Sequence, residues 1–195
     1  MLTKKQAEST LKIIFSINME LFNKIDYRIV GTSSSLLQGV NIPCNDIDIL
    51  VKDRKAVDKF SANMCTYQIN KNPYFINYNN GGQYICEIGV NGVIVEMSTC
   101  EWETPSEYVE TYGVGPWKYF TKVNFDSYEI FGVKNELRLL TELARNRQDR
   151  IGPLVQFLIN NGANFDLLKS GMVALNIPNE KILEIEALFN HLTNF

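Results

Sequence analysis

The feature that most constrains the fold is a pair of alternating apolar segments, residues 84–90 and 93–98, joined by Asn91-Gly92. Asn-Gly between two such segments is the strongest short-range indication of a β-hairpin with a two-residue type I′ turn. A two-residue turn also fixes the register of the two strands. Residues at equal distances from the turn should then face one another, namely Val90 and Val93, Ile88 and Val95, and Glu87 and Glu96.

The two glutamates of this hairpin are expected on the face opposite its apolar side chains. Directly opposed carboxylates repel each other unless a cation, a basic side chain or a shared proton relieves them. A bound metal ion is one such relief, which makes Glu96 a candidate metal ligand. Glu87 takes its place if the register slips.

A second predicted strand, residues 46–51, carries two further carboxylates. Its sequence alternates, so Asp46 and Asp48 share one face. The other face, which should be buried, carries Ile47, Ile49 and Val51. Two carboxylates at positions i and i+2, joined by a third from a neighbouring strand, suit a divalent cation with oxygen ligands such as Mg²⁺.

A glycine turn precedes this strand in the chain. Residues 27–30 form a short apolar segment that runs into Gly31, and the serine-rich residues 32–35 indicate the start of a short helix. Backbone N–H groups and hydroxyl groups at such a turn can hold a phosphate. A bound triphosphate would in turn explain why carboxylates for a metal ion lie nearby.

The two motifs have a fixed spacing in the chain. Val30-Gly31-Thr32 is followed, after thirteen residues, by Asp46-Ile47-Asp48-Ile49. In this pattern the chain resembles the nucleotidyltransferase superfamily related to DNA polymerase beta. Within that superfamily it is similar to the small bacterial enzymes that include the lincosamide- and aminoglycoside-modifying enzymes and the minimal antitoxin-type proteins. The resemblance implies an α/β (α+β) fold, with a mixed sheet flanked by helices and followed by a helical C-terminal portion.

The resemblance also implies an activity. In these relatives three acids bind two metal ions, which activate an acceptor hydroxyl for attack on the α-phosphate of a nucleoside triphosphate such as ATP and assist the departure of pyrophosphate. The acceptor would be a small molecule such as an antibiotic, or a protein. The residues implied are Asp46, Asp48 and Glu96 for two Mg²⁺ ions, with Glu96 also as the base, and Gly31, Thr32 and Ser33 for the triphosphate.

The sequence departs from the family pattern in two places. Thr32 stands where Gly or Ser is usual, and Gln148-Asp149 stands where many relatives have Lys-Asp, so that Arg147 or Arg150 would have to replace a phosphate-binding lysine. These departures keep a second hypothesis open. The chain would then be a non-catalytic nucleotide-binding or interaction protein that retains the fold and pairs with a second chain or forms an oligomer.

The chain as a whole is predicted to divide into an α/β catalytic core over 1–131 and a helical C-terminal portion over 132–195. Apolar periodicity predicts helices over 5–24, 54–64, 133–150, 153–160, 165–170 and 179–192, with a short helix after Pro105, weak strand character over 71–82 and a last strand over 128–131. Within 133–150, charged residues at i, i+4 spacing suggest a solvated ladder of Arg138, Glu142, Arg145 and Asp149. Aromatic residues that could wall a pocket are Trp102, Tyr108, Tyr112, Trp117 and Tyr119.

Composition excludes several classes of protein. The net charge is −3 with a sequence pI near 5.3, so nucleic acid is not the expected partner. No segment approaches the roughly 18 consecutive apolar residues of a membrane-spanning helix, and no apolar signal core follows the polar start, which predicts a cytoplasmic protein. The four cysteines are too far apart for a Cys-x-x-Cys zinc site and too few for a disulfide scaffold.

Overall fold

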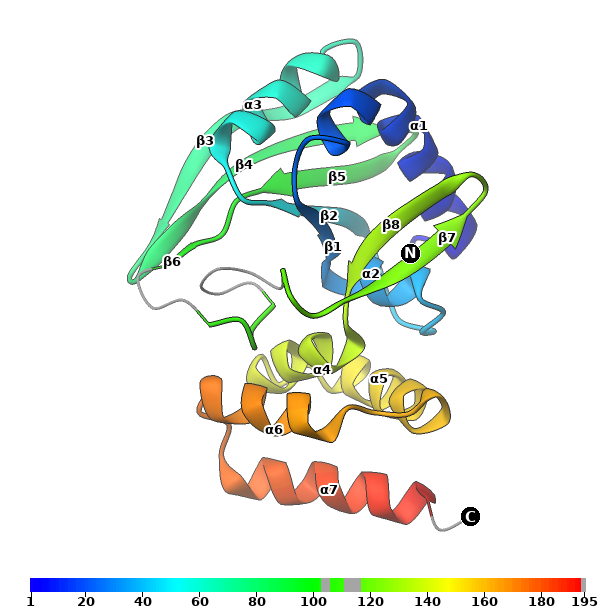
Figure 1. The fold of residues 1–195 in the computed structure, drawn as a ribbon, viewed down its shortest axis with the longest axis vertical. Helices are drawn as coiled ribbons and strands as arrows, with labels where there is room; N and C mark the ends of the chain where they lie inside the picture. Colours follow the sequence, from blue (N-terminus) through cyan, green and yellow to red (C-terminus); the bar gives the residue numbers. More distant parts are fainter. Residues whose placement is uncertain (103–105, 111–116, 194–195) are drawn as a thin grey trace.

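The computed structural model describes residues 1–102, 106–110 and 117–193, which form one mixed β-sheet and seven helices (Figure 1). The strands are β1 (Tyr27–Val30), β2 (Asp46–Val51), β3 (Gln68–Tyr78), β4 (Gly81–Val90), β5 (Val93–Ser98), β6 (Glu101–Trp102), β7 (Phe120–Phe125) and β8 (Tyr128–Val133). The helices are α1 (Lys4–Phe22), α2 (Gly31–Leu37), α3 (Arg54–Asn63), α4 (Asn135–Ala144), α5 (Gln148–Asn161), α6 (Phe165–Ala174) and α7 (Asn179–Thr193). Helices α6 and α7 are stacked on the other C-terminal helices, away from the sheet (Figure 1).

The sheet has the strand order β3-β4-β5-β2-β1-β8-β7, and the short β6 pairs with β4. Strand β2 runs parallel to β5 and antiparallel to β1, while β1 runs parallel to β8. This mixed sheet with flanking helices confirms the predicted fold class. The predicted hairpin is confirmed in its register as well, because β4 and β5 pair Val90 with Val93, Ile88 with Val95 and Glu87 with Glu96.

One face of the sheet is covered by α1 and α3 (Figure 1). The alternation predicted for β2 is confirmed here, since Ile47, Ile49 and Val51 are fully buried in the hydrophobic cluster on this face. Helix α1 contributes Leu11 and Ile14 to the same cluster. The carboxylates at the even positions of β2 therefore have to lie on the other face.

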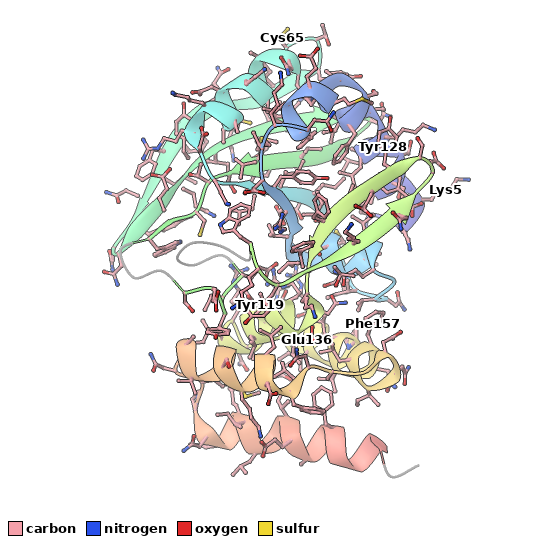
Figure 2. All side chains as sticks on the ribbon, in the orientation of Figure 1. Lys5, Cys65, Tyr119, Tyr128, Glu136 and Phe157 are labelled. Atoms are coloured by element: carbon pink, nitrogen blue, oxygen red, sulfur yellow. The ribbon has the colours of Figure 1, made fainter. Side chains whose placement is uncertain are left out.

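That other face of β2 is turned toward the C-terminal helices. Leu50, which shares the face of Asp48, belongs to a second hydrophobic cluster together with Leu140 of α4 and side chains of α5 and α6. Tyr119 packs against this cluster, in the space between the sheet and the helices (Figure 2). Residues from both sides of position 131 thus contribute to one cluster, and the division of the chain into portions 1–131 and 132–195 stays a prediction.

The two-residue β6 was not predicted, and the two longer strands that the sequence pattern predicted poorly, β3 and β7, lie at the edges of the sheet. Strand β3 covers eleven residues where only weak strand character is expected from residue 71 on, and its side chains are mostly exposed on both faces. Without a buried face there is no reason for polar and apolar residues to alternate. Strand β7 was not predicted, because its sequence pattern did not indicate a strand. It forms by antiparallel pairing with β8.

The helical portion is divided differently from the prediction. A single helix over 133–150 is wrong, because α4 ends at Ala144, Asn146 adopts a left-handed conformation with φ 54°, and α5 begins at Gln148 and continues through Pro153. The short helix expected after Pro105 falls partly on residues 111–116, which lie outside the described residues, and residues 106–110 form turns and bends. Within the described ranges, no helix has the length and apolar character needed to cross a bilayer.

Candidate active site

Asp46, Asp48 and Glu96 lie on one face of two neighbouring strands. In the parallel pair of β2 and β5, Asp48 is directly opposite Glu96, and Asp46 lies two residues before Asp48 on the same face. Glu87 occupies the same row one strand farther away, where its Oε2 is 2.8 Å from the Nζ atom of Lys71. Glu87 therefore has a cation of its own, and Glu96 is the glutamate adjacent to Asp48.

The pKa values of Asp48 and Glu96 are those of carboxylates that are buried and crowded together. Burial raises the pKa of Asp48 well above its usual value, and the charges of Asp46, Glu96 and Glu110 raise it further. Burial likewise raises the pKa of Glu96 to about 7, with smaller contributions from Asp46 and Glu87. A divalent cation among these groups would offset the repulsion that their ionised forms experience.

Gly31 is the first residue of α2, where the chain turns out of β1, and it lies directly beside the carboxylate of Asp48. Its φ of +67° is in the left-handed region that favours glycine. A Cβ atom at this position would collide with Oδ2 of Asp48. The backbone N–H of Gly31 donates a hydrogen bond to Oε1 of Glu110 at 2.6 Å. Glycine is thus required here for both its conformation and its lack of a side chain.

Thr32 and Ser33, which were expected to contact a triphosphate, have other partners in this structure. The Ser33 hydroxyl is fully buried, donates to the carbonyl of Val30 at 2.8 Å and accepts the N–H of Asp48 at 3.3 Å. Thr32 is buried as well, and its side chain is hydrogen-bonded to the thiol of Cys44. The Ser33 hydroxyl therefore joins the glycine turn to the carboxylate strand, which fixes the relative position of the two motifs.

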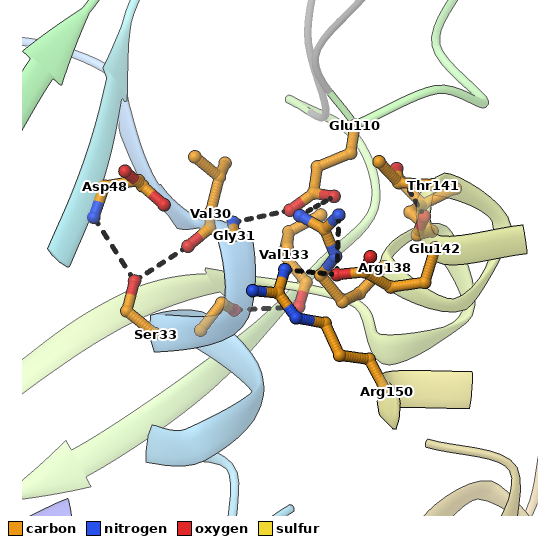
Figure 3. Close-up of polar contacts among 12 residues, drawn as sticks. Val30, Gly31, Ser33, Asp48, Glu110, Val133, Arg138, Thr141, Glu142 and Arg150 are labelled. Atoms are coloured by element: carbon orange, nitrogen blue, oxygen red, sulfur yellow. Dashed lines mark hydrogen bonds and ion pairs between the residues drawn. The ribbon is translucent and has the colours of Figure 1, made fainter. Parts of the chain in front are cut away.

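Gly31 is joined through Glu110 to a network of charged side chains, which also includes Arg138, Glu142 and Arg150 (Figure 3). Nη1 of Arg138 is 2.8 Å from Oε2 of Glu110, and Nη2 is 3.0 Å from Oε1 of Glu142. The same oxygen of Glu142 accepts a hydrogen bond from Arg150 at 3.1 Å. Arg138 is 2% exposed, and Glu110 and Glu142 are fully buried. The predicted solvated ladder is therefore wrong for Arg138 and Glu142, which form a buried ion pair.

A cavity of about 330 Å³ connects these groups. It is lined by Val30, Gly31, Asp48, Leu50, Tyr78, Gln83, Glu96, Ser98, Trp102, Arg138 and Arg145. The lining thus includes the glycine turn, two arginines, two carboxylates and a pair of stacked rings, Tyr78 and Trp102, whose centroids are 5.7 Å apart. Cations and carboxylates face the same space, as a charged substrate bound together with a metal ion requires.

Several other predicted residues lie away from this cavity. Among the aromatic residues, Trp102 lines it, whereas Tyr108, Trp117 and Tyr119 pack against the second hydrophobic cluster; Tyr112 is outside the described residues. Of the two arginines proposed to replace the family lysine, Arg147 is paired with Asp149 on the surface and Arg150 is bound to Glu142. Arg145 lines the cavity in their place.

The fit of this site to a metal ion depends on its oxygen atoms. Carboxylate oxygens are the ligands that Mg²⁺ prefers, and two carboxylates on adjacent strands face one cavity. In the part of the chain that the structure describes, no three acidic, cysteine or histidine side chains already converge as a metal site would require. The donor set therefore fits Mg²⁺ in its chemistry, and its side chains would have to close around the ion.

Sequence reasoning missed Glu110 and the role of Arg138. Glu110 is separated from Gly31 by 79 residues and belongs to no recognisable pattern. Arg138 did carry a signal, its i, i+4 spacing from Glu142, but this spacing is the same for a buried pair and for a solvated one. Only the packing of α4 against the sheet places these residues at the glycine turn.

Comparison with known proteins shows similarity in structure alone. No protein-family model matches the sequence, and no curated protein is significantly similar to it. The structure is similar to that of a candidate nucleotidyltransferase from Thermotoga maritima, with a TM-score of 0.60, 19% identity and coverage of 80% of this chain and 95% of that one. It is also similar to an antigenic nucleotidyltransferase-like protein from Paracoccidioides brasiliensis, with a TM-score of 0.50, 13% identity and coverage of 97% and 94%.

A third similar structure is that of ANT(2")-Ia in complex with adenylyl-2"-tobramycin. The TM-score is 0.46, the identity is 12%, and 94% of this chain and 97% of that one are covered. A similarity at this level carries no argument about substrates. The similarity therefore concerns the fold, which is a mixed sheet with flanking helices like that of these nucleotidyltransferase-like structures.

Proposed function

We propose that this protein is a magnesium-dependent nucleotidyltransferase, which transfers a nucleoside monophosphate from a nucleoside triphosphate to a hydroxyl acceptor and releases pyrophosphate. The observation that carries the proposal is the cavity in which Asp48 and Glu96 face the same space as Gly31, Arg138 and Arg145. Carboxylates for metal ions and donors for a polyphosphate are the two requirements of this chemistry. The nucleotidyltransferase-like fold supports it.

In the proposed mechanism, Asp46, Asp48 and Glu96 would hold Mg²⁺, which supplies charge neutralisation for the phosphates and the leaving group. The guanidinium groups of Arg138 and Arg145, which line the same cavity, would bind phosphate oxygens. Glu96 would accept the proton of the acceptor hydroxyl.

The direct test is titration calorimetry with each of the four ribonucleoside triphosphates, with and without Mg²⁺, followed by an assay for pyrophosphate release. Magnesium-dependent binding of a triphosphate and release of pyrophosphate with a hydroxyl acceptor are the expected results. Absence of triphosphate binding would contradict the proposal. The protein would then be better described as a non-catalytic interaction protein with this fold.

Removal and addition of the metal give a second prediction. The raised pKa of Glu96 means that its ionised form is disfavoured in the folded state, so the metal-free protein loses stability as the pH rises through about 7. Because Mg²⁺ binds the ionised form, we expect Mg²⁺ in large excess over its dissociation constant to raise the Tm by about 5 °C at pH 8. The increase should be smaller at pH 5.5, and thermal unfolding at the two pH values measures it. An equal shift at both would contradict the assignment.

Arg145 provides a prediction about triphosphate binding. It lines the cavity with an exposed side chain, so Arg145→Ala should leave the Tm unchanged and weaken triphosphate binding by about tenfold, through loss of a charge-assisted hydrogen bond. Calorimetry measures the change. Arg147→Ala is the matched control, because Arg147 is an exposed arginine two residues away that is paired with Asp149. If both variants weaken binding equally, the effect is one of net charge and Arg145 does not contact the triphosphate.

A further inference from the structure

Glu110 occupies a position that a bound anion would be expected to occupy. Its carboxylate accepts the N–H of Gly31 through Oε1 at 2.6 Å and lies 2.8 Å from Arg138 through Oε2. These two partners come from distant elements, the first residue of α2 and the helix α4, and Glu110 lies between them (Figure 3). Both partners line the cavity with Asp48 and Glu96. Glu110 is fully buried at their meeting point and lies just outside the residues that line the cavity.

We propose that the Glu110 carboxylate takes the place of a phosphate group of the nucleoside triphosphate, so that triphosphate binding has to displace it from Gly31 and Arg138. This inference rests on the proposed function and adds an internal competitor to it. A backbone N–H group and a guanidinium group bind carboxylate and phosphate oxygens by the same charge-assisted hydrogen bonds. Gly31 has one N–H group, so it cannot serve both anions fully at the same time.

The network allows this exchange without leaving the arginine unpaired. Arg138 keeps its second carboxylate, since Nη2 remains 3.0 Å from Glu142, which is itself bound to Arg150. The guanidinium group therefore stays anchored when Glu110 leaves. The charge of Glu110 acts on Asp48, and a phosphate that replaces Glu110 would bring at least the same negative charge to this position. The exchange thus couples triphosphate binding to the carboxylates that would hold the metal.

When an internal group competes with the ligand, the apparent dissociation constant equals the intrinsic one divided by the fraction of molecules in which the site is free. Glu110→Gln retains the size of the side chain but removes its charge, and the amide competes poorly for a guanidinium group and a backbone N–H. We therefore expect Glu110→Gln to bind inorganic triphosphate with Mg²⁺ at least about tenfold more tightly than the wild type. Inorganic triphosphate is the probe because it reports phosphate binding without a base.

Glu142→Gln is the matched control for this experiment. It removes an equally buried carboxylate from the same guanidinium group but leaves Gly31 bound to Glu110. Calorimetry should show a clear gain for Glu110→Gln and a smaller one for Glu142→Gln. Equal gains would show that net charge alone matters and would overturn the displacement, as would unchanged or weaker binding in Glu110→Gln.

A measurement on the wild type keeps the inference testable if Glu110→Gln does not fold. With ¹⁵N-labelled glycine, the Gly31 amide resonance should move when inorganic triphosphate and Mg²⁺ are added, because its acceptor changes. A resonance that stays in place while the ligand binds would overturn the displacement. If neither the wild type nor any folded variant binds triphosphate, the proposed function fails as well; if the wild type binds and Glu110→Gln binds no more tightly, this inference alone falls.

Discussion

Asp48→Asn is expected to reduce nucleotidyl transfer on the order of 10³-fold while the protein remains folded. The asparagine side chain has nearly the same size but lacks the charge of a metal ligand. Asp48 is surrounded by the charges of Asp46, Glu96 and Glu110, so the loss of its charge also relieves repulsion. The Tm should therefore be equal to that of the wild type or higher. Pyrophosphate release and thermal unfolding measure the two effects.

Glu87→Gln is the control for this variant. Glu87 lies in the same row of carboxylates, opposite Glu96, but is paired with Lys71 and does not line the cavity. Its substitution should leave transfer within about twofold of the wild type, as is usual for a surface ion pair away from a site. Full activity in Asp48→Asn, or loss of activity in Glu87→Gln with retention in Glu96→Gln, would contradict the assignment of ligands.

Gly31→Ala is expected to reduce both stability and activity. Alanine at a φ of +67° costs about 1–2 kcal/mol, and the added Cβ collides with Oδ2 of Asp48. The collision is relieved most readily if the Asp48 carboxylate moves, so a proposed ligand is displaced along with the turn. We expect a total loss in the free energy of unfolding of at least about 2 kcal/mol. Transfer should fall on the order of 10²-fold.

Gly92→Ala separates the two causes. Gly92 in the hairpin turn also has a positive φ, 76°, but nothing lies within 4 Å of the position of an added Cβ. This variant should lose about 1–2 kcal/mol of unfolding free energy from backbone strain alone and keep its activity. Denaturant unfolding and pyrophosphate release compare the two variants. Equal activity in both would show that the contact between Gly31 and Asp48 has no catalytic importance.

The local sequence pattern was sufficient to predict a strand and its orientation where the segment has one buried face. Strand β2 alternates because its odd positions are fully buried under α1 and α3, and the Asn91-Gly92 turn fixes which residues of β4 and β5 are opposite each other. The prediction that Glu87 and Glu96 are paired followed from the turn alone. Pattern failed for β3, which is exposed on both faces at the sheet edge. It also failed where Asn146 ends a helix that the sequence pattern continues.

The sequence by itself determined the strand that carries Asp46 and Asp48, the glycine turn before it and the strand that carries Glu96, because side-chain alternation and turn chemistry depend on near neighbours in the chain. Only the tertiary structure decided that β2 and β5 are parallel neighbours, with Asp48 opposite Glu96. It alone placed Arg138 and Glu110 at Gly31, across a separation of 79 residues between Gly31 and Glu110. Such contacts arise when the helices bury their apolar faces against the sheet, and the free energy of that burial depends on the whole chain and not on any local pattern.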